Sequence, residues 1–161
     1  MASVEIKGLQ ALTERLQRLG RDTDAIVDNS LNQSAEQIRK QAQINIQNMS
    51  VSYNGAIYDA KETGQLMREQ HVERLGLCRY AVGTFVEYAP YVEFGTGSAG
   101  DPIVPHTART VWTYYDEILG GFRTAYPRPP CPFLRPAFET YRNRVAKDIY
   151  AALLKAVNNN G

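Results

Sequence analysis

The last part of the sequence carries the pattern that most restricts the fold. Apolar residues recur there at helical spacing and form one continuous stripe, which consists of Phe138, Tyr141, Val145, Ile149, Ala152 and Ala156. Pro136 suits the first turn of a helix, where its missing N–H breaks no bond, and the run Asn158 to Gly161 ends the pattern. The sequence therefore predicts a C-terminal helix over residues 133–157 that needs another element to cover its stripe.

Helical spacing also marks the N-terminal region, so we expect helices within residues 8–48. A first stripe, ended by Gly20, consists of Leu9, Leu12, Leu16 and Leu19. Asp22 or Asp24 can cap a second helix that runs to about Asn48. The apolar positions of this second helix are Val27, Leu31, Ala35, Ile38 and Ala42. Its opposite face is rich in glutamine, which suits a neighbouring subunit and an exposed surface equally well.

The middle of the chain changes from helical to extended patterns. Residues 49–65 contain the turn signals Asn54-Gly55 and Thr63-Gly64, so we expect a loop there, whose ordering could depend on assembly. Alternating and β-branched residues after it predict two short strands, one on either side of Gly76. A further hairpin is expected from strands at 110–115 and 122–126.

A proline-rich run, "YPRPPCPF", joins this hairpin to the last helix. It lacks several amide donors, so it cannot be a central strand and reads as a stiff, extended lead-in. Together the elements predict an α+β fold, in which an antiparallel sheet of about four strands, within residues 66–126, is flanked by long N-terminal and C-terminal helices. The 161 residues suffice for one domain, residues 1–161, with a real core.

The charge and hydropathy of the chain argue against several classes of protein. The formal net charge of +1 does not steer the whole chain toward nucleic acid or an anionic membrane. No run approaches the roughly 18 apolar residues of a membrane span, and no secretory signal is visible, so we expect folding in the cytoplasm. Residues 121–147 nevertheless carry six cationic side chains against Glu139 alone. A solvated helix face is the simpler interpretation, and contact with phosphate or an acidic protein is the alternative.

Four kinds of reactive site were considered, and none is supported. Cys78 and Cys131 do not pair compactly with His71 or His106 as a nucleophile or a zinc site, and each reads as a structural thiol. Glu87 and Glu93 could be imagined as the carboxylate pair of a glycosidase, but nothing except their closeness in sequence supports this. The run "EFGTGSAG" has no lysine and no nucleotide-binding spacing. We therefore expect neither an enzyme nor a cofactor or metal site.

The stretch "YAPYVEFGTG", Tyr88 to Gly97, reads instead as a rigid corner. Pro90 suits the start of a short helix, so Ala89 to Phe94 is expected to form little more than one turn. Gly95 can adopt the left-handed conformation that ends such a turn. Aromatic surface on a short, rigid element serves either a small core or a subunit contact, and both interpretations stay open.

The order of these motifs resembles the lambdoid "gene product ten" family of tailed phages. "TGQL", at Thr63 to Leu66, resembles the family's Thr-Gly-x-Leu element, although "MREQ" follows it here where an apolar-serine pattern is usual. In the corner the resemblance falls on Tyr88, Ala89, Tyr91, Val92, Glu93, Gly95 and Thr96. In "PFLRPA" it falls on Pro132, Phe133, Leu134, Arg135, Pro136 and Ala137. The aromatic hairpin is similar to one that many members carry, with Trp112 and Phe122 as anchors.

The resemblance implies a structural virion protein of the neck or upper tail, made in the bacterial cytoplasm. Such a protein would complete the tail and join it to the DNA-filled head as part of a ring around the DNA channel, with six-fold symmetry favoured. Its partners would be other copies of itself, neighbouring neck proteins and the tail terminator or tail tube, while DNA passes without sequence-specific binding. Another neck ring (a connector or the tail terminator) and a nucleic-acid-binding protein are the alternatives.

A ring requires two different patches that meet between neighbouring copies. The stiff, apolar corner and the "RPPCPFLRP" lead-in are candidate halves of that contact. The candidate interface residues are Tyr88, Ala89, Tyr91, Val92, Glu93, Gly95, Thr96, Gly97, Pro132, Phe133, Leu134, Arg135 and Pro136. Arg135 is either a satisfied cation at the edge of the core or an ion-pair partner between subunits. The segments 49–61 and 98–106 could reach an adjoining ring.

Overall fold

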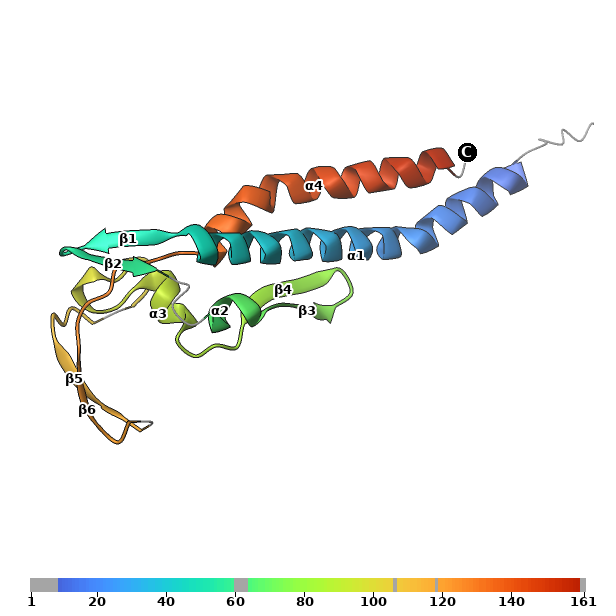
Figure 1. The fold of residues 1–161 in the computed structure, drawn as a ribbon. Coiled ribbons are helices and arrows are strands. Elements are labelled where there is room, and N and C mark those ends of the chain that lie inside the picture. The colour runs from blue at the N-terminus through green and yellow to red at the C-terminus, as the bar shows by residue number, and fades with distance from the viewer. Residues whose placement is uncertain (1–8, 60–63, 106, 118, 160–161) are drawn as a thin grey trace, which may run out of the picture.

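The fold was determined as a computed structural model that describes residues 9–59, 64–105, 107–117 and 119–159. For residues 9–19, 21 and 159 it describes the backbone alone. The leucine stripe of residues 9–19, Lys61, Thr63 and His106 therefore lie outside the described side chains. Two long antiparallel helices, α1 (Leu9–Asn48) and α4 (Leu134–Asn159), lie side by side, and hairpins fill the chain between them (Figure 1). The predicted α+β fold with long terminal helices is confirmed.

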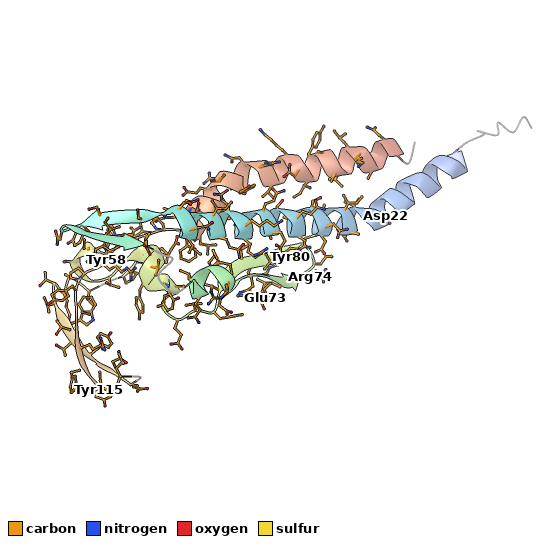
Figure 2. All side chains as sticks on the ribbon, viewed as in Figure 1. Asp22, Tyr58, Glu73, Arg74, Tyr80 and Tyr115 are labelled. Carbon is orange, nitrogen blue, oxygen red and sulfur yellow. The ribbon has the colours of Figure 1, made fainter. Side chains whose placement is uncertain are left out.

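The N-terminal region forms one helix where two were predicted. Helix α1 continues through Gly20 and bends near Asp22 (Figure 2). Gly20 does not adopt the positive φ of a helix-ending glycine, and a glycine within a helix is tolerated at about 1 kcal/mol. Asp22 and Asp24 consequently lie inside the helix and do not cap it. The prediction that Gly20 ends a helix is therefore wrong.

The buried face of α1 contains the predicted apolar stripe and two serines. Ala35, Ile38 and Ala42 are buried, as their spacing predicted. Ser30 and Ser34 are also buried, and each hydroxyl donates to the backbone carbonyl four residues earlier, at 2.9 Å. These bonds satisfy the hydroxyl groups inside the helix, so small polar side chains can lie against a neighbouring element.

The segment predicted as a loop contains a hairpin. Strands β1 (Ser50–Tyr53) and β2 (Ala56–Asp59) pair in antiparallel register around Asn54-Gly55, both of which have positive φ. Asn-Gly at a two-residue connection favours the turn whose twist matches the strands. The turn signal was recognised, but four residues on either side were too few to read as strands. A short helix, α2 (Gln65–Arg68), follows.

The remaining strands form two further hairpins. Strands β3 (Gln70–Gly76) and β4 (Arg79–Thr84) lie on either side of a turn at Leu77-Cys78, close to the predicted positions around Gly76. Strands β5 (Trp112–Asp116) and β6 (Gly121–Ala125) form the predicted aromatic hairpin. Within the described residues the six strands make three separate two-stranded sheets, where one sheet of about four strands was expected.

The core lies at one end of the helix pair, where α1, the chain around residues 86–92 and the start of α4 meet. Its buried members include Ile38, Ala42, Ile46, Leu66, Val86, Ala89, Val92, Cys131, Phe133 and Ala137. Tyr141 packs against this cluster, but Phe138, at the start of the predicted stripe, is 56% exposed. Ala137 and Tyr141, about one turn apart, face the core, and Phe138 points about 100° away from Ala137 around the helix axis. None of the described helices is long and apolar enough to cross a membrane.

Candidate functional site

The aromatic corner has the predicted local structure. Helix α3 (Ala89–Phe94) spans the expected residues, has Pro90 in its first turn and is followed by Gly95 with a φ of 71°. A short 3-10 helix, Gly97–Ala99, comes next. One face of α3 is buried through Ala89 and Val92, whereas Tyr91 is 61% exposed on the other. The corner therefore serves the core and also presents an aromatic ring to solvent.

Glu93 links the corner to the C-terminal helix. Its carboxylate is buried, and one oxygen accepts hydrogen bonds from the backbone N–H groups of Phe133 at 2.7 Å and Leu134 at 2.9 Å. The other oxygen accepts the N–H of Arg135 at 2.9 Å. These amides are at the beginning of α4, where backbone donors have no partner within the helix and the helix dipole favours a negative charge. Glu93 is thus a helix cap supplied by a segment 40 residues earlier in the chain.

Backbone contacts join the rest of the corner to the proline-rich lead-in. The N–H of Cys131 donates to the carbonyl of Val92 at 2.8 Å, and Thr96 and Arg128 form an isolated antiparallel bridge. A Cβ at Gly95 would lie 2.5 Å from the carbonyl oxygen of Arg128, so only glycine fits at this approach. The two segments that the sequence suggested as halves of a contact between copies pack against each other within one copy.

The candidate interface residues therefore divide by exposure. Buried are Ala89, Val92, Glu93, Gly95, Gly97 and Phe133. Half-buried are Thr96, Pro132, Leu134, Arg135 and Pro136. Exposed are Tyr88 and Tyr91. A direct role in a contact between copies stays a prediction for all of them, and the exposed tyrosines are best placed for it.

Arg135 is paired within the chain. Its guanidinium lies 2.9 Å from the carboxylate of Asp101, which is 8% exposed. The backbone N–H of Asp101 donates to the carbonyl of Phe94 at 2.7 Å, and its side chain accepts the N–H of Ile103 at 3.0 Å. Of the two interpretations of Arg135, the satisfied cation at the edge of the core is the one that the geometry favours. The same contacts fix the start of the 98–106 segment to α3.

An open apolar groove lies beside this braced corner. It has a volume of about 960 Å³, and its walls come from α1, from β4 with the residues that follow it, and from the start of α4. Representative lining residues are Ala35, Ile38, Val82, Phe85, Phe133 and Phe138. Phe85, which stacks on His71 with ring centroids 4.2 Å apart, is 82% exposed. The sequence did not predict the groove, because its walls come from segments more than 100 residues apart.

The β5–β6 hairpin projects away from the helices, as Figure 1 shows. Trp112 at its base is half-buried and packs near Gly97, consistent with its predicted role as an anchor. Phe122 contacts Tyr115 edge-to-face, with centroids 5.3 Å apart, but is 78% exposed. Phe122 therefore does not anchor the hairpin within this chain.

A charged cluster fastens the β3–β4 hairpin to α1. Asp28 accepts the backbone N–H of Cys78 at 2.8 Å and the hydroxyl of Tyr80 at 2.9 Å, and lies 3.2 Å from the guanidinium of Arg74. The amide of Cys78 contributes most to holding the pKa of Asp28 below its usual value. Arg74 and Tyr80 are labelled beside α1 in Figure 2. The arrangement is a structural tether between elements 50 residues apart.

Neither cysteine has the environment of an activated nucleophile. Burial raises the pKa of the Cys131 thiol, and desolvation followed by the nearby Asp28 and Asp24 charges raises that of Cys78. A raised pKa lowers the fraction of reactive thiolate at neutral pH. Both oxygens of Glu93 accept hydrogen bonds from backbone amides, which gives this carboxylate a structural role. Among the described residues no group of His, Cys, Asp or Glu side chains is placed to hold a metal ion.

The cationic skew of the C-terminal part is partly neutralised by ion pairs. Arg123 lies 3.1 Å from Asp116, and Arg144 lies 3.5 Å from Asp148. Arg135 is paired with Asp101, as described above, and Arg128 donates to the backbone carbonyl of Asp59 at 2.7 Å. Much of the positive charge therefore serves contacts within the chain, which weakens the alternative of a phosphate-binding surface.

Comparison with known proteins gives one family match. Residues 10–95 match the family described as "Bacteriophage HK97-gp10, putative tail-component". The match includes nearly all of α1, the first two hairpins and α3, and it ends before the β5–β6 hairpin and residues 132–136. No significant match was found among curated proteins or among solved structures. Because the matched residues make up more than half of the chain, the chain belongs to the HK97-gp10-like family of bacteriophage tail components.

Proposed function

We propose that this chain is a structural subunit at the phage head–tail junction. It completes the tail and joins it to the DNA-filled head as one copy in a ring around the DNA channel, with six-fold symmetry favoured. Its contacts are with further copies, with neighbouring neck proteins and with the tail terminator or tail tube. The DNA passes through the channel without sequence-specific binding. The family assignment supports a location in the phage tail, and the exposed apolar surface of the subunit supports its assembly with other subunits.

The observation that carries the proposal is the apolar surface of the single chain. The described residues include more large apolar side chains that are exposed than buried, and Ile57, Phe85 and Phe122 are each more than 75% exposed. An isolated soluble protein rarely leaves so much apolar surface open, and contiguous apolar patches mark sites of interaction. The subunit is therefore suited to a state in which neighbours cover it.

The occupied polar groups of the corner agree with a structural role. Glu93 caps a helix and Arg135 is paired with Asp101, so the charged groups nearest the aromatic rings hold the fold. What the corner offers to a partner is Tyr88 and Tyr91. Rigid, exposed aromatic side chains lose little entropy on binding and are frequent at the centre of protein interfaces.

The proposal is tested in the phage that encodes this chain, by placing a nonsense codon in its gene. DNA-filled heads and full-length tails are expected to accumulate separately in the lysate, as seen by electron microscopy. Purified protein is then incubated with the tails alone, the excess is removed and heads are added. Joined particles are expected after this order, and not when the heads alone are treated first. Joining after treatment of the heads would support a connector ring instead.

A single substitution tests the exposed part of the corner. We expect Tyr91→Ala to remain soluble and folded while joined particles fall at least tenfold, because the ring is 61% exposed and makes its contact with a partner. Tyr150→Ala, which removes a ring that is 65% exposed on α4, is the matched control. Joined particles at the normal level without the protein, or with Tyr91→Ala, would contradict the proposed role of the chain or of the corner, respectively.

A further inference from the structure

We propose that the β5–β6 hairpin of one copy occupies the apolar groove of the next copy. The inference rests on the proposed function in taking the occupant to be a neighbour in the ring. The proposed contact brings together two exposed apolar surfaces of the chain, the projecting β5–β6 hairpin and the groove. Each copy would give its hairpin to one neighbour and receive a hairpin from the other.

The hairpin has few contacts that would stabilise it alone. It is a two-stranded sheet without a further strand, and an isolated hairpin of this kind is marginally stable in water. Its exposed apolar side chains are Val111, Tyr114, Tyr115, Leu119, Phe122 and Tyr126. A covering surface would therefore bury apolar area and also hold the strands in register.

One face of the hairpin is suited to enter an apolar site. Tyr115 lies opposite Phe122 in the register, and the next pair on the same face is Thr113 with Thr124. This face carries no charge. The other face carries the ion pair between Asp116 and Arg123, whose side chains retain access to water. The Tyr115–Phe122 face therefore points into the groove and the charged face points outward.

The groove matches this face in chemistry. Its lining is mostly apolar, with Phe85 and Phe138 exposed at its rim by 82% and 56%. Aromatic rings at the rim and on the hairpin can pack edge-to-face as Tyr115 and Phe122 already do. A volume of about 960 Å³ and an open mouth suit a segment of polypeptide with several side chains.

The hairpin supplies a large part of the area that a contact between two copies needs. An aromatic side chain carries about 150–250 Å². Tyr114 lies on the charged face and is not counted. Tyr115, Phe122 and Tyr126 are 54% to 78% exposed, so together they offer on the order of 300–500 Å² before Leu119, Val111 and the backbone are added. A stable interface needs about 800 Å² from each partner.

The geometry favours a second copy over the same copy. The hairpin points away from α1 and α4 (Figure 1). None of its described residues is among those that line the groove of the same copy. Because the two patches are different surfaces, the contact is heterologous, and repeating it generates a ring when the rotation between copies closes. The bracing of α3 against α4 places the base of the hairpin and the groove in one rigid unit.

Cross-linking between separately tagged copies tests this contact. Each copy carries Cys78→Ser, and one cysteine is added either at the hairpin, Thr124→Cys, or at the groove rim, Glu87→Cys. A short bis-maleimide is expected to link the hairpin variant to the groove variant at least tenfold more than to the control, Lys155→Cys, at the far end of α4. Cross-linking of the hairpin variant to itself would show a symmetric contact and overturn the proposal.

A second measurement uses charge to block each side. Phe122→Asp removes the hairpin contact and Phe85→Asp removes the groove contact, so each variant alone is expected to sediment as a monomer with an unchanged circular dichroism spectrum. Their mixture retains one intact contact per pair and is expected to give dimers and no larger species. A wild-type protein that stays monomeric at its highest soluble concentration, without specific cross-links, would overturn the proposal.

These outcomes are separable from those of the joining assay. Specific hairpin-to-groove cross-links together with normal head–tail joining in the absence of the protein would uphold this contact and refute the proposed function. Normal dependence of joining on the protein, together with cross-links only to other virion proteins, would uphold the function and refute this contact.

Discussion

A single buried carboxylate fixes the relation between the corner and the last helix. Glu93 is 5% exposed, and burying a charge is unfavourable unless hydrogen bonds compensate for the lost water. Three backbone donors at the beginning of α4 supply that compensation, and they would otherwise lack partners themselves. The side chain and the helix end each satisfy the other. The residue that resembled a possible catalytic acid is therefore part of the scaffold.

Substitution of this carboxylate tests the cap. We expect Glu93→Gln to lower the free energy of unfolding by about 2–3 kcal/mol, because one acceptor oxygen is replaced by an NH₂ group that faces a backbone donor. Urea denaturation measures the change. Glu87→Gln, an exposed position in the same segment, is the control and should change stability by less than about 0.5 kcal/mol. Equal stability of the two variants would show that Glu93 does not cap the helix.

The charge of Asp28 gives the stability of the protein a pH dependence. Its pKa in the folded chain is lowered, first by the backbone amide of Cys78. A carboxyl whose pKa is lower in the folded state stabilises the fold above its unfolded value, about 3.9, and loses this contribution as the pH falls through the folded value. Asp28→Asn should therefore be less stable than the wild type at neutral pH.

The difference between Asp28→Asn and the wild type should narrow as the pH falls below about 4. Unfolding followed by circular dichroism at several pH values measures it, with the exposed Asp22→Asn on the same helix as the matched control. A difference that stays constant from neutral to acidic pH would show that the charge of Asp28 makes no stabilising contact.

At the scale of elements, sequence patterns predicted several helices and hairpins whose formation depends on residues close together in the chain. Helix α3 has its predicted bounds because a proline start and a glycine end act within six residues. The β3–β4 and β5–β6 hairpins were found for the same reason. The cap by Glu93 and the groove were not predicted. Their residues come from segments 40 to more than 100 residues apart, and a pattern within one stretch of sequence does not indicate which distant segments come into contact.

The α1 helix shows how packing overrides a local signal. Gly20 resembles a helix end, and Asp22 or Asp24 resembles the cap of a new helix, yet the helix is continuous. A glycine inside a helix costs only about 1 kcal/mol, and packing against the other elements can exceed this amount. Ala35, Ile38 and Ala42 are buried on one face of α1. Their burial needs a regular helix over these residues, and it does not need the helix to begin after Gly20.

A substitution at Gly20 tests the continuity of α1. We expect Gly20→Ala to raise the free energy of unfolding by about 0.5–1 kcal/mol, because alanine favours the helix and a Cβ at this position meets no atom within 4 Å. Gly55→Ala is the opposing control, since Gly55 has a φ of +78° and alanine there is strained. Destabilisation by Gly20→Ala would mean that a helix ends at this residue.

At the scale of the whole molecule, the charge distribution bears on the alternative function. The formal net charge is +1, and several C-terminal cations are used in ion pairs within the chain. Affinity for duplex DNA depends on the number of phosphates that free cations neutralise. The charge of the subunit therefore disfavours tight binding to duplex DNA.

We expect the purified subunit to show no tight binding to duplex DNA at physiological salt, as measured by fluorescence anisotropy with a labelled oligonucleotide. Arg142→Ala combined with Lys147→Ala should leave the weak residual signal nearly unchanged. Tight binding that falls steeply with added salt and is lost in this double variant would favour the nucleic-acid-binding alternative.

The division of the strands into three separate pairs has a consequence for the time before assembly. Each pair leaves two edges whose backbone groups could join strands of another chain. The strands are only four to seven residues long, and short edges offer little length for such mispairing. The short edges therefore limit mispairing of strands between copies while their apolar surfaces are uncovered.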